Sequence, residues 1–233
     1  MPKFNEPVAP HSANLSYEQL IQGWPAFEAQ ILALLETLDL ADKALVCDHV
    51  ALRVNSIASA NALKDAFSRV GKIISDNIIN GRTILIIELD TPLTLGQFSI
   101  ACVELPYPSD KVYPLEGWEH IELVIDSKAK DCDTLSQDLL VLCPTLRPLL
   151  NLGLSPLPQS EQTAESEQTA ESEQSRLPDL PSLAEIKVKM SSPKGDKERL
   201  ANPTIAFKLG NVCIKVHPHG IKAVIASEQV SEC

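Results

Sequence analysis

The sequence predicts an α+β protein built from two tandem βαβββ modules, which form a cupped mixed β-sheet beside an N-terminal helical region. Two stretches support this fold, because residues 48–54 and 119–125 each place an acid, a histidine and then alternating apolar residues on one strand. His49 and His120 are 71 residues apart, which is about the length of one βαβββ unit. A repeat of this kind predicts two similar structural units. Strand alternation puts each histidine on the face opposite the apolar residues.

Length and composition limit the classes of protein. A chain of 233 residues with 44% apolar residues can bury a substantial core. The net charge of −11 argues against nucleic acid or a membrane surface as partner, since both need a basic face. No stretch approaches the ~18 apolar residues of a membrane span, and the first residues do not read as a secretory signal. Six cysteines without close spacing then favour free thiols and a cytoplasmic location.

Residues 1–43 are expected to form the N-terminal helical region. Apolar residues recur at three- and four-residue intervals between Ser16 and Leu40, which is the pattern of an amphipathic helix. Ser16 is a suitable N-cap. Trp24-Pro25 is expected to split the helix, because proline disfavours helix in the residue before it and removes a hydrogen-bond donor.

The first module is expected over residues 44–114. Asn80-Gly81 is a strong two-residue turn signal and predicts a β-hairpin. Gly71 is a suitable residue to end the helix that precedes this hairpin. The expected elements, in order, are a strand at 46–54, a helix capped by Ser56, paired strands at 72–79 and 82–89, and a strand at 98–105.

The second module is expected over residues 115–228 and repeats this order, with residues 229–233 as a tail. Residues 160–175 repeat the hexapeptide Ser-Glu-Gln-Thr-Ala-Glu, which has no apolar side chain larger than alanine. Such a segment cannot bury enough surface to offset its ordering entropy, so residues 152–181 are expected to be a disordered acidic insert. The expected elements are a strand at 118–125, a helix capped near Ser127 and ended by Pro144, and strands at 185–190, 204–208 and 212–217.

The two equivalent histidines, His49 and His120, predict one shared site, provided that the first strands of the modules lie side by side about a pseudo-twofold axis. Imidazole is the commonest metal ligand in proteins, so a shared metal site is indicated. Glu104 is the expected carboxylate ligand, since a glutamate in an apolar strand is costly unless it is paired or coordinated. The alternative for Glu104 is a solvent-facing position at the end of its strand.

Three further residues have more than one interpretation. The favoured role of Glu122 is an ion pair with Arg53, and metal ligation is the second. Lys215 occupies the place where a carboxylate would be symmetrical with Glu104. His217, one step further along the same face, either substitutes as a metal ligand or lies exposed in a loop that ends the strand.

Five segments of the chain resemble the YecM family, which lies within the vicinal oxygen chelate superfamily of glyoxalase I, bleomycin-resistance proteins, methylmalonyl-CoA epimerase and extradiol dioxygenases. The segments are residues 47–53, 104–108, 117–122, 191–195 and 214–218. The resemblance covers the chain from the N-terminal helical region to about Glu228, except the hexapeptide insert. It implies a nearly closed sheet around a cavity. It also implies metal ligands on the first and fourth strands of each module, which here are His49, Glu104 and His120, with Lys215 or His217 fourth.

This resemblance implies a divalent metal ion, Zn, Fe, Mn or Ni, in a Lewis-acid role. A lysine at the fourth ligand position implies either three protein ligands plus water or no metal. The first hypothesis is a metal-dependent isomerase, epimerase, lyase or dioxygenase that acts on a small oxygenated substrate, with Glu122 as general base and Arg53 holding substrate charge. The alternatives are a metal-free small-molecule binding module and a non-catalytic regulatory partner protein. A monomer is expected, because one chain contains both modules.

Overall fold

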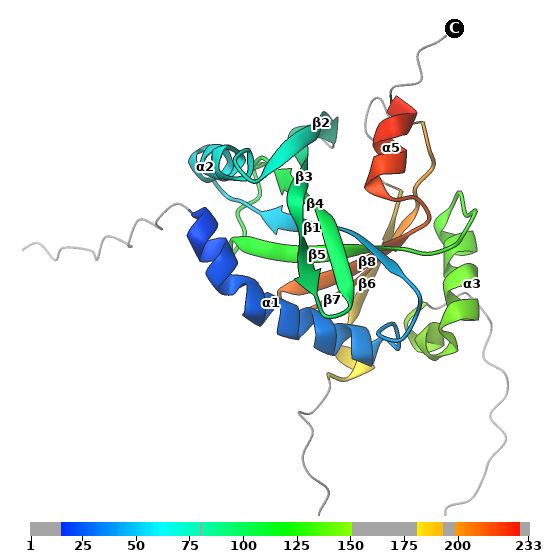
Figure 1. Cartoon of the computed structure of the whole chain (residues 1–233). Coiled ribbons are helices and arrows are strands. Elements are labelled where there is room, and N and C mark those ends of the chain that lie inside the picture. Colours follow the sequence, from blue (N-terminus) through cyan, green and yellow to red (C-terminus); the bar gives the residue numbers. More distant parts are fainter. Residues whose placement is uncertain (1–14, 80, 151–180, 193–198, 229–233) are drawn as a thin grey trace, which may run out of the picture.

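A computed structural model describes residues 15–79, 81–150, 181–192 and 199–228. It confirms the α+β class, with eight strands in one mixed sheet and an N-terminal helix (Figure 1). The predicted insert at 152–181, apart from its last residue, and the tail at 229–233 lie outside the described residues. The strands are β1 Val46–Arg53, β2 Gly71–Ile79, β3 Arg82–Leu95, β4 Phe98–Pro106, β5 Gly117–Val124, β6 Lys187–Ser191, β7 Thr204–Leu209 and β8 Val212–His217. The helices are α1 Tyr17–Thr37, α2 Ile57–Phe67, α3 Cys132–Leu142, α4 Arg147–Leu150 and α5 Ile221–Glu228, with 3₁₀ turns at Pro144–Leu146 and Leu183–Glu185.

The first strands of the two halves are neighbours at the centre of the sheet. The strand order is β2-β3-β4-β1-β5-β8-β7-β6. β1 and β5 pair antiparallel, and each also pairs in parallel with the fourth strand of its own half, β4 or β8. This arrangement brings the two histidine motifs together, as the repeat predicted.

Helix α1 is continuous, so the predicted break at Trp24-Pro25 is wrong. Ser16 caps the helix as expected and forms a capping box with Gln19. Buried residues lie on both sides of Pro25, and the Trp24 indole donates a hydrogen bond of 3.1 Å to the Thr94 carbonyl. Packing on both sides of the proline therefore offsets the one backbone bond that proline removes.

Three other local expectations differ from the structure. Asp131, not Ser127, caps α3, because the Ser127 hydroxyl is engaged by Asp138 and Ala129.

α2 ends at Phe67, and Gly71 begins β2. A Cβ atom on Gly71 would lie 2.5 Å from the Glu88 carbonyl oxygen, so this glycine permits close strand approach rather than ending a helix. α5 was not expected from the sequence.

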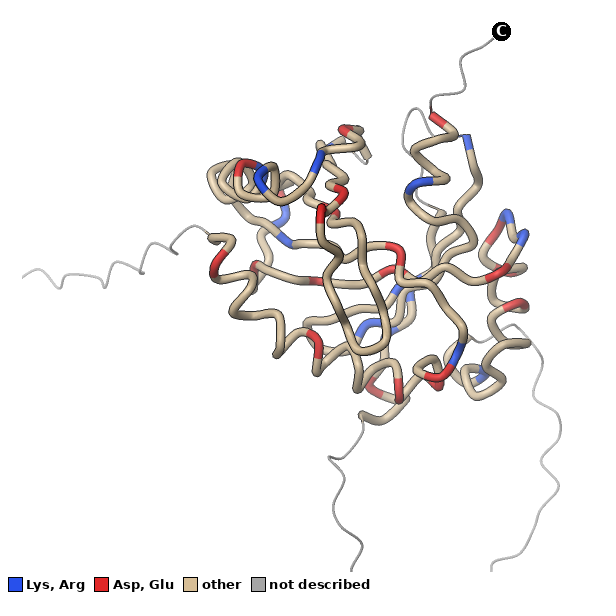
Figure 2. The backbone as a smooth tube through the Cα atoms, viewed as in Figure 1, with Lys and Arg blue, Asp and Glu red and all other residues tan. Residues whose placement is uncertain are grey.

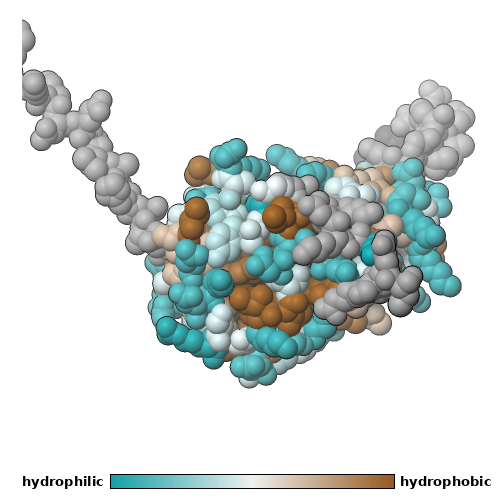
Figure 3. All heavy atoms as spheres, turned by 90° about the horizontal axis from the view of Figure 1, so that it is seen from above, coloured by the Kyte–Doolittle hydropathy of each residue, from teal (hydrophilic) through white to brown (hydrophobic). Residues whose placement is uncertain are grey.

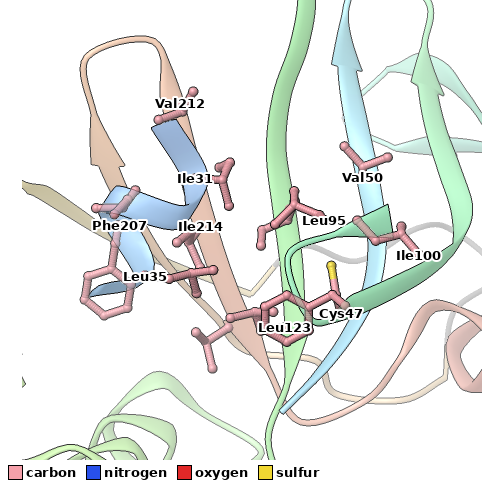
Figure 4. Close-up of a cluster of buried hydrophobic side chains, with 14 of the residues drawn as sticks. Ile31, Leu35, Cys47, Val50, Leu95, Ile100, Leu123, Phe207, Val212 and Ile214 are labelled. Carbon is pink, nitrogen blue, oxygen red and sulfur yellow. The ribbon is translucent and has the colours of Figure 1, made fainter. Parts of the chain in front are cut away.

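The main core lies on one face of the sheet. Ile31 and Leu35 of α1 face apolar side chains of the central strands, including Leu123 and Ile214 (Figure 4). A smaller cluster on the opposite face joins Ile225 of α5 to the first module. Its other buried members are Ile84, Ile86 and Cys102. The opposite face is therefore covered only in part by apolar packing.

Charged residues are spread over several elements of the fold (Figure 2). Figure 2 shows acidic and basic positions within the central strands as well as on helices and loops. Seen from above, a hydrophobic patch lies in the middle of the molecule among hydrophilic residues (Figure 3). No helix within the described ranges has the length and apolar content to cross a membrane. The five cysteines in those ranges are free thiols.

Candidate metal centre

Three buried donors from β1 and β5 meet on the polar face of the sheet. His49 lies opposite Glu122, and His120 lies opposite Ala51 in the antiparallel ladder. Strand alternation therefore places both histidines and Glu122 on one face. One ligand atom from each of these three residues lies within 4.8 Å of the others. Two imidazoles and a carboxylate at this spacing could hold a metal ion.

The Glu122 carboxylate is at the middle of this group. Its Oε1 atom lies 3.1 Å from His120 Nε2, 3.6 Å from His49 Nε2 and 2.7 Å from Lys215 Nζ. Its Oε2 atom lies 3.4 Å from His217 Nδ1. Glu122 thus contacts nitrogen atoms on β1, β5 and β8.

Two β-bulges in the ladder between β1 and β5 each place one carboxylate near the Nδ1 atom of a histidine. The ladder between β1 and β5 shifts register between Cys47 and His49, and again between Ala51 and Leu52. These shifts leave Asp48 and Glu119 as the extra residues. His49 Nδ1 donates to Asp48 Oδ2 at 3.0 Å, and His120 Nδ1 lies 3.7 Å from Glu119 Oε2. A carboxylate at Nδ1 orients the ring and leaves Nε2 available for a metal, and bulges are common beside such sites.

Glu104 and His217 lie at the edge of the group. Glu104 Oε2 is 3.7 Å from His49 Nε2, so this carboxylate turns toward the histidine rather than away from the site. The exposed-loop interpretation of His217 is wrong, because this residue is 2% exposed. Its Nδ1 atom accepts a hydrogen bond of 3.0 Å from Asn202. Neither residue belongs to the compact group of three donors.

The predicted ion pair between Arg53 and Glu122 is wrong. Arg53 pairs with Glu119, and its guanidinium stacks 4.6 Å from the centre of the Tyr113 ring. Glu122 pairs with Lys215 instead. The bulge at Glu119 explains why Arg53 pairs with Glu119 instead of Glu122, because the extra residue supplies a carboxylate nearer to Arg53.

Buried opposite charges shift the pKa values of the donors. Burial alone would lower the pKa of His49, but Glu122, Asp48 and Glu104 outweigh it and hold the pKa well above its usual value. Burial alone would raise the pKa of Glu122, but Lys215 and His49 hold it well below its usual range. Burial lowers the pKa of His217. The centre is therefore a dense ionic network with Glu122 deprotonated.

Unsatisfied nitrogen atoms mark the interior of this network. Within the part of the chain that the structure describes, three buried side-chain atoms have no hydrogen-bond partner, namely His49 Nε2, His217 Nε2 and Arg53 Nε. Buried polar atoms normally have a partner, so an orphaned imidazole nitrogen facing a carboxylate is a reason to expect a missing ligand. The donor set of two imidazoles and one carboxylate suits Fe(II), Mn, Ni or Zn.

Sequence reasoning missed the roles of Asp48, Glu119 and Asn202. The repeated acid before each histidine was a visible signal for the first two residues. The position of Asn202 depends on a loop fold that no motif of the chain indicated. Lys215 was placed correctly on the site face, but its partner Glu122 was not foreseen.

Comparisons with known proteins agree with the family resemblance. The family model described as YecM protein matches residues 16–228. Protein YecM of Escherichia coli (strain K12) is 37% identical over 185 residues, which cover 79% of each chain. An uncharacterized protein of Haemophilus influenzae is 35% identical over 203 residues, covering 84% of this chain and 86% of the relative. The solved structure titled "Structural Genomics, Protein EC4020" superposes with a TM-score of 0.66 at 31% identity, covering 91% of this chain and 92% of that one.

Proposed function

The chain belongs to the YecM family, and from this premise we propose that it is a metal-binding protein of the vicinal oxygen chelate type. The ligands are His49 Nε2, His120 Nε2 and Glu122, with Glu104 beside them. The observation that carries the proposal is the buried His49 Nε2 atom, which has no hydrogen-bond partner although two further donors lie within 4.8 Å.

The charges around the centre support a divalent cation. Among the described residues that meet there, carboxylates outnumber permanent cations by two. A buried excess of negative charge is unfavourable. Without an ion, a protonated His49 offsets one of these charges, and a divalent ion with both imidazoles neutral would balance both. The carboxylates are Asp48, Glu104, Glu119 and Glu122, and the permanent cations are Arg53 and Lys215.

His49, His120 and Glu122 would hold the metal ion, which would supply Lewis acidity toward two neighbouring oxygens of a small substrate. We propose that the protein is a metal-dependent isomerase, epimerase, lyase or dioxygenase of this type. We assign Glu122 to ligation rather than to proton abstraction, because its low pKa makes it a weak base. Arg53 acts as a positioning residue, since it holds Glu119 beside His120.

Elemental analysis of protein purified without a histidine tag tests the proposal. After incubation with Zn, Mn, Fe(II) or Ni and removal of free ions, the wild type is expected to retain one ion per chain. His49→Ala and His120→Ala should each lose it. His219→Ala is the matched control, because this histidine is only partly buried and lies outside the group of donors. Full metal content in both site variants would show that the site is wrong.

One observation favours the second candidate, a metal-free binding module. Lys215 already supplies a positive charge 2.7 Å from Glu122, which reduces the need for an ion. A wild type that takes up no metal, yet is thermally stabilised by a small molecule, would support this candidate instead. A monomer suffices for either function, because one chain supplies both halves of the centre.

A further inference from the structure

We infer that Lys215 anchors an anionic ligand at the metal centre, so that the substrate is a small organic anion with two neighbouring oxygens, such as a 2-oxo or 2-hydroxy carboxylate. The two neighbouring oxygens would bind the metal, and the remaining carboxylate oxygen would bind the Lys215 ammonium. This inference rests on the proposed function and adds the charge and orientation of the substrate.

The position of Lys215 in the sheet is the first reason. Lys215 of β8 lies beside Glu122 of β5, on the site face. Its counterpart in the first half is Glu104 of β4, which lies beside Ala51 of β1. A cation in the second half therefore occupies the place of a carboxylate in the first half.

The exposure of Lys215 is the second reason. Its side chain is 28% exposed, whereas the side chains of His49, His120 and Glu122 are 1%, 5% and 10% exposed. Lys215 therefore lies between the buried donors and solvent. A ligand that approaches the donors from that side meets the ammonium group.

The hydrogen bonds of Lys215 are the third reason. The ammonium group has three N–H donors, and one of them binds Glu122 Oε1. If Glu122 held a metal ion, part of its negative charge would be balanced by that ion, and the Lys215 ammonium would be available to another anion. We assign this role to Lys215 rather than to Arg53, because the Arg53 side chain is 8% exposed and contacts Glu119 and Tyr113.

The charges on the two sides of the centre also orient the ligand. Glu104 lies 3.7 Å from His49 Nε2 on the first-module side, where it repels an anion. The charged end of the substrate is thus directed toward Lys215 and away from Glu104.

A spectroscopic titration of the Co²⁺-loaded protein tests this inference. The probes are oxalate, a dianion with neighbouring oxygens, and lactamide, a neutral molecule that also has two neighbouring oxygens. We expect the wild type to bind oxalate more tightly than lactamide. Lys215→Met should weaken oxalate binding by about 10-fold or more, because a charge-assisted hydrogen bond is lost. Lactamide binding should change by less than about 3-fold, and cobalt affinity should be retained or rise, since the ammonium no longer competes for Glu122.

Lys215→Arg is the matched control and should keep the preference for oxalate. Unchanged oxalate affinity in Lys215→Met would overturn the inference while leaving the metal site intact. Equal affinity of the wild type for oxalate and lactamide would also overturn it, and this comparison does not depend on the folding of any variant. A wild type that takes up no cobalt would overturn the proposed function together with this inference.

Discussion

The two halves of the molecule place histidines at equivalent positions but differ in the charged residues around them. His49 of β1 and His120 of β5 each follow an acid that lies at Nδ1. The fourth strands differ, because β4 carries Glu104 and β8 carries Lys215. The second half instead provides its carboxylate, Glu122, on its first strand. The imidazoles therefore occupy equivalent positions in the two halves. The carboxylate lies on the fourth strand of the first half but on the first strand of the second half, where the fourth strand carries Lys215.

A second difference concerns what covers each half. α5 packs on the site face of the first half through Ile225, Ile84 and Ile86, and its first backbone N–H donates to Asp48 at 2.7 Å. In the second half, the Lys215 side chain on β8 is 28% exposed beside Glu122. Access to the centre is therefore expected from the side of β8, where Lys215 lies.

The largest expected effect tests whether the two halves pack alike. Leu63 of α2 and Leu139 of α3 are both fully buried. Leu63→Ala and Leu139→Ala should each lower the free energy of unfolding by about 2–5 kcal/mol, because each leaves a cavity. Urea denaturation measures this, with Val141→Ala as control, since Val141 is 85% exposed. A neutral result for only one of the leucines would show that the halves do not share their packing.

The next largest expected effect is the difference between Glu122 and Glu104 in their contribution to metal affinity. Glu122→Gln should weaken metal binding on the order of 100-fold, because it removes a member of the compact donor group. Glu104→Gln should weaken it only about 10-fold, as expected for an outer-shell partner. Isothermal titration with Zn²⁺ measures both affinities. The reverse order would mean that the fourth strand of the first half provides the ligand, as the family resemblance implied.

The smallest expected effect is the difference in metal affinity between variants of Asp48 and Glu119, the acids next to the two histidines. Asp48 Oδ2 lies 3.0 Å from His49 Nδ1, whereas Glu119 Oε2 lies 3.7 Å from His120 Nδ1 and is also held by Arg53. Asp48→Asn should lower the metal affinity by about 10-fold, and Glu119→Gln by less. Competition with a chromophoric chelator resolves such a difference. Equal losses would show that the two acids orient their histidines equally well.

The sequence was sufficient to predict the order of strands along the chain and the proximity of His49 and His120. Periodicity, the Asn80-Gly81 turn and the repeated acid–histidine pairs carry that information locally. The partners of Arg53 and Glu122 could not be predicted, because a bulge such as the one at Glu119 arises from the pairing of two strands and not from either strand alone. Likewise, the continuity of α1 through Pro25 depends on tertiary packing. α5 was missed because an eight-residue helix has too few residues for a clear period.

Anomalous diffraction at the zinc absorption edge, from crystals of the Zn²⁺-loaded protein, tests the metal centre most directly. We expect one strong peak about 2 Å from both His49 Nε2 and His120 Nε2, in contact with the Glu122 carboxylate. A peak elsewhere in the molecule, or the lack of any peak after loading, would contradict the account.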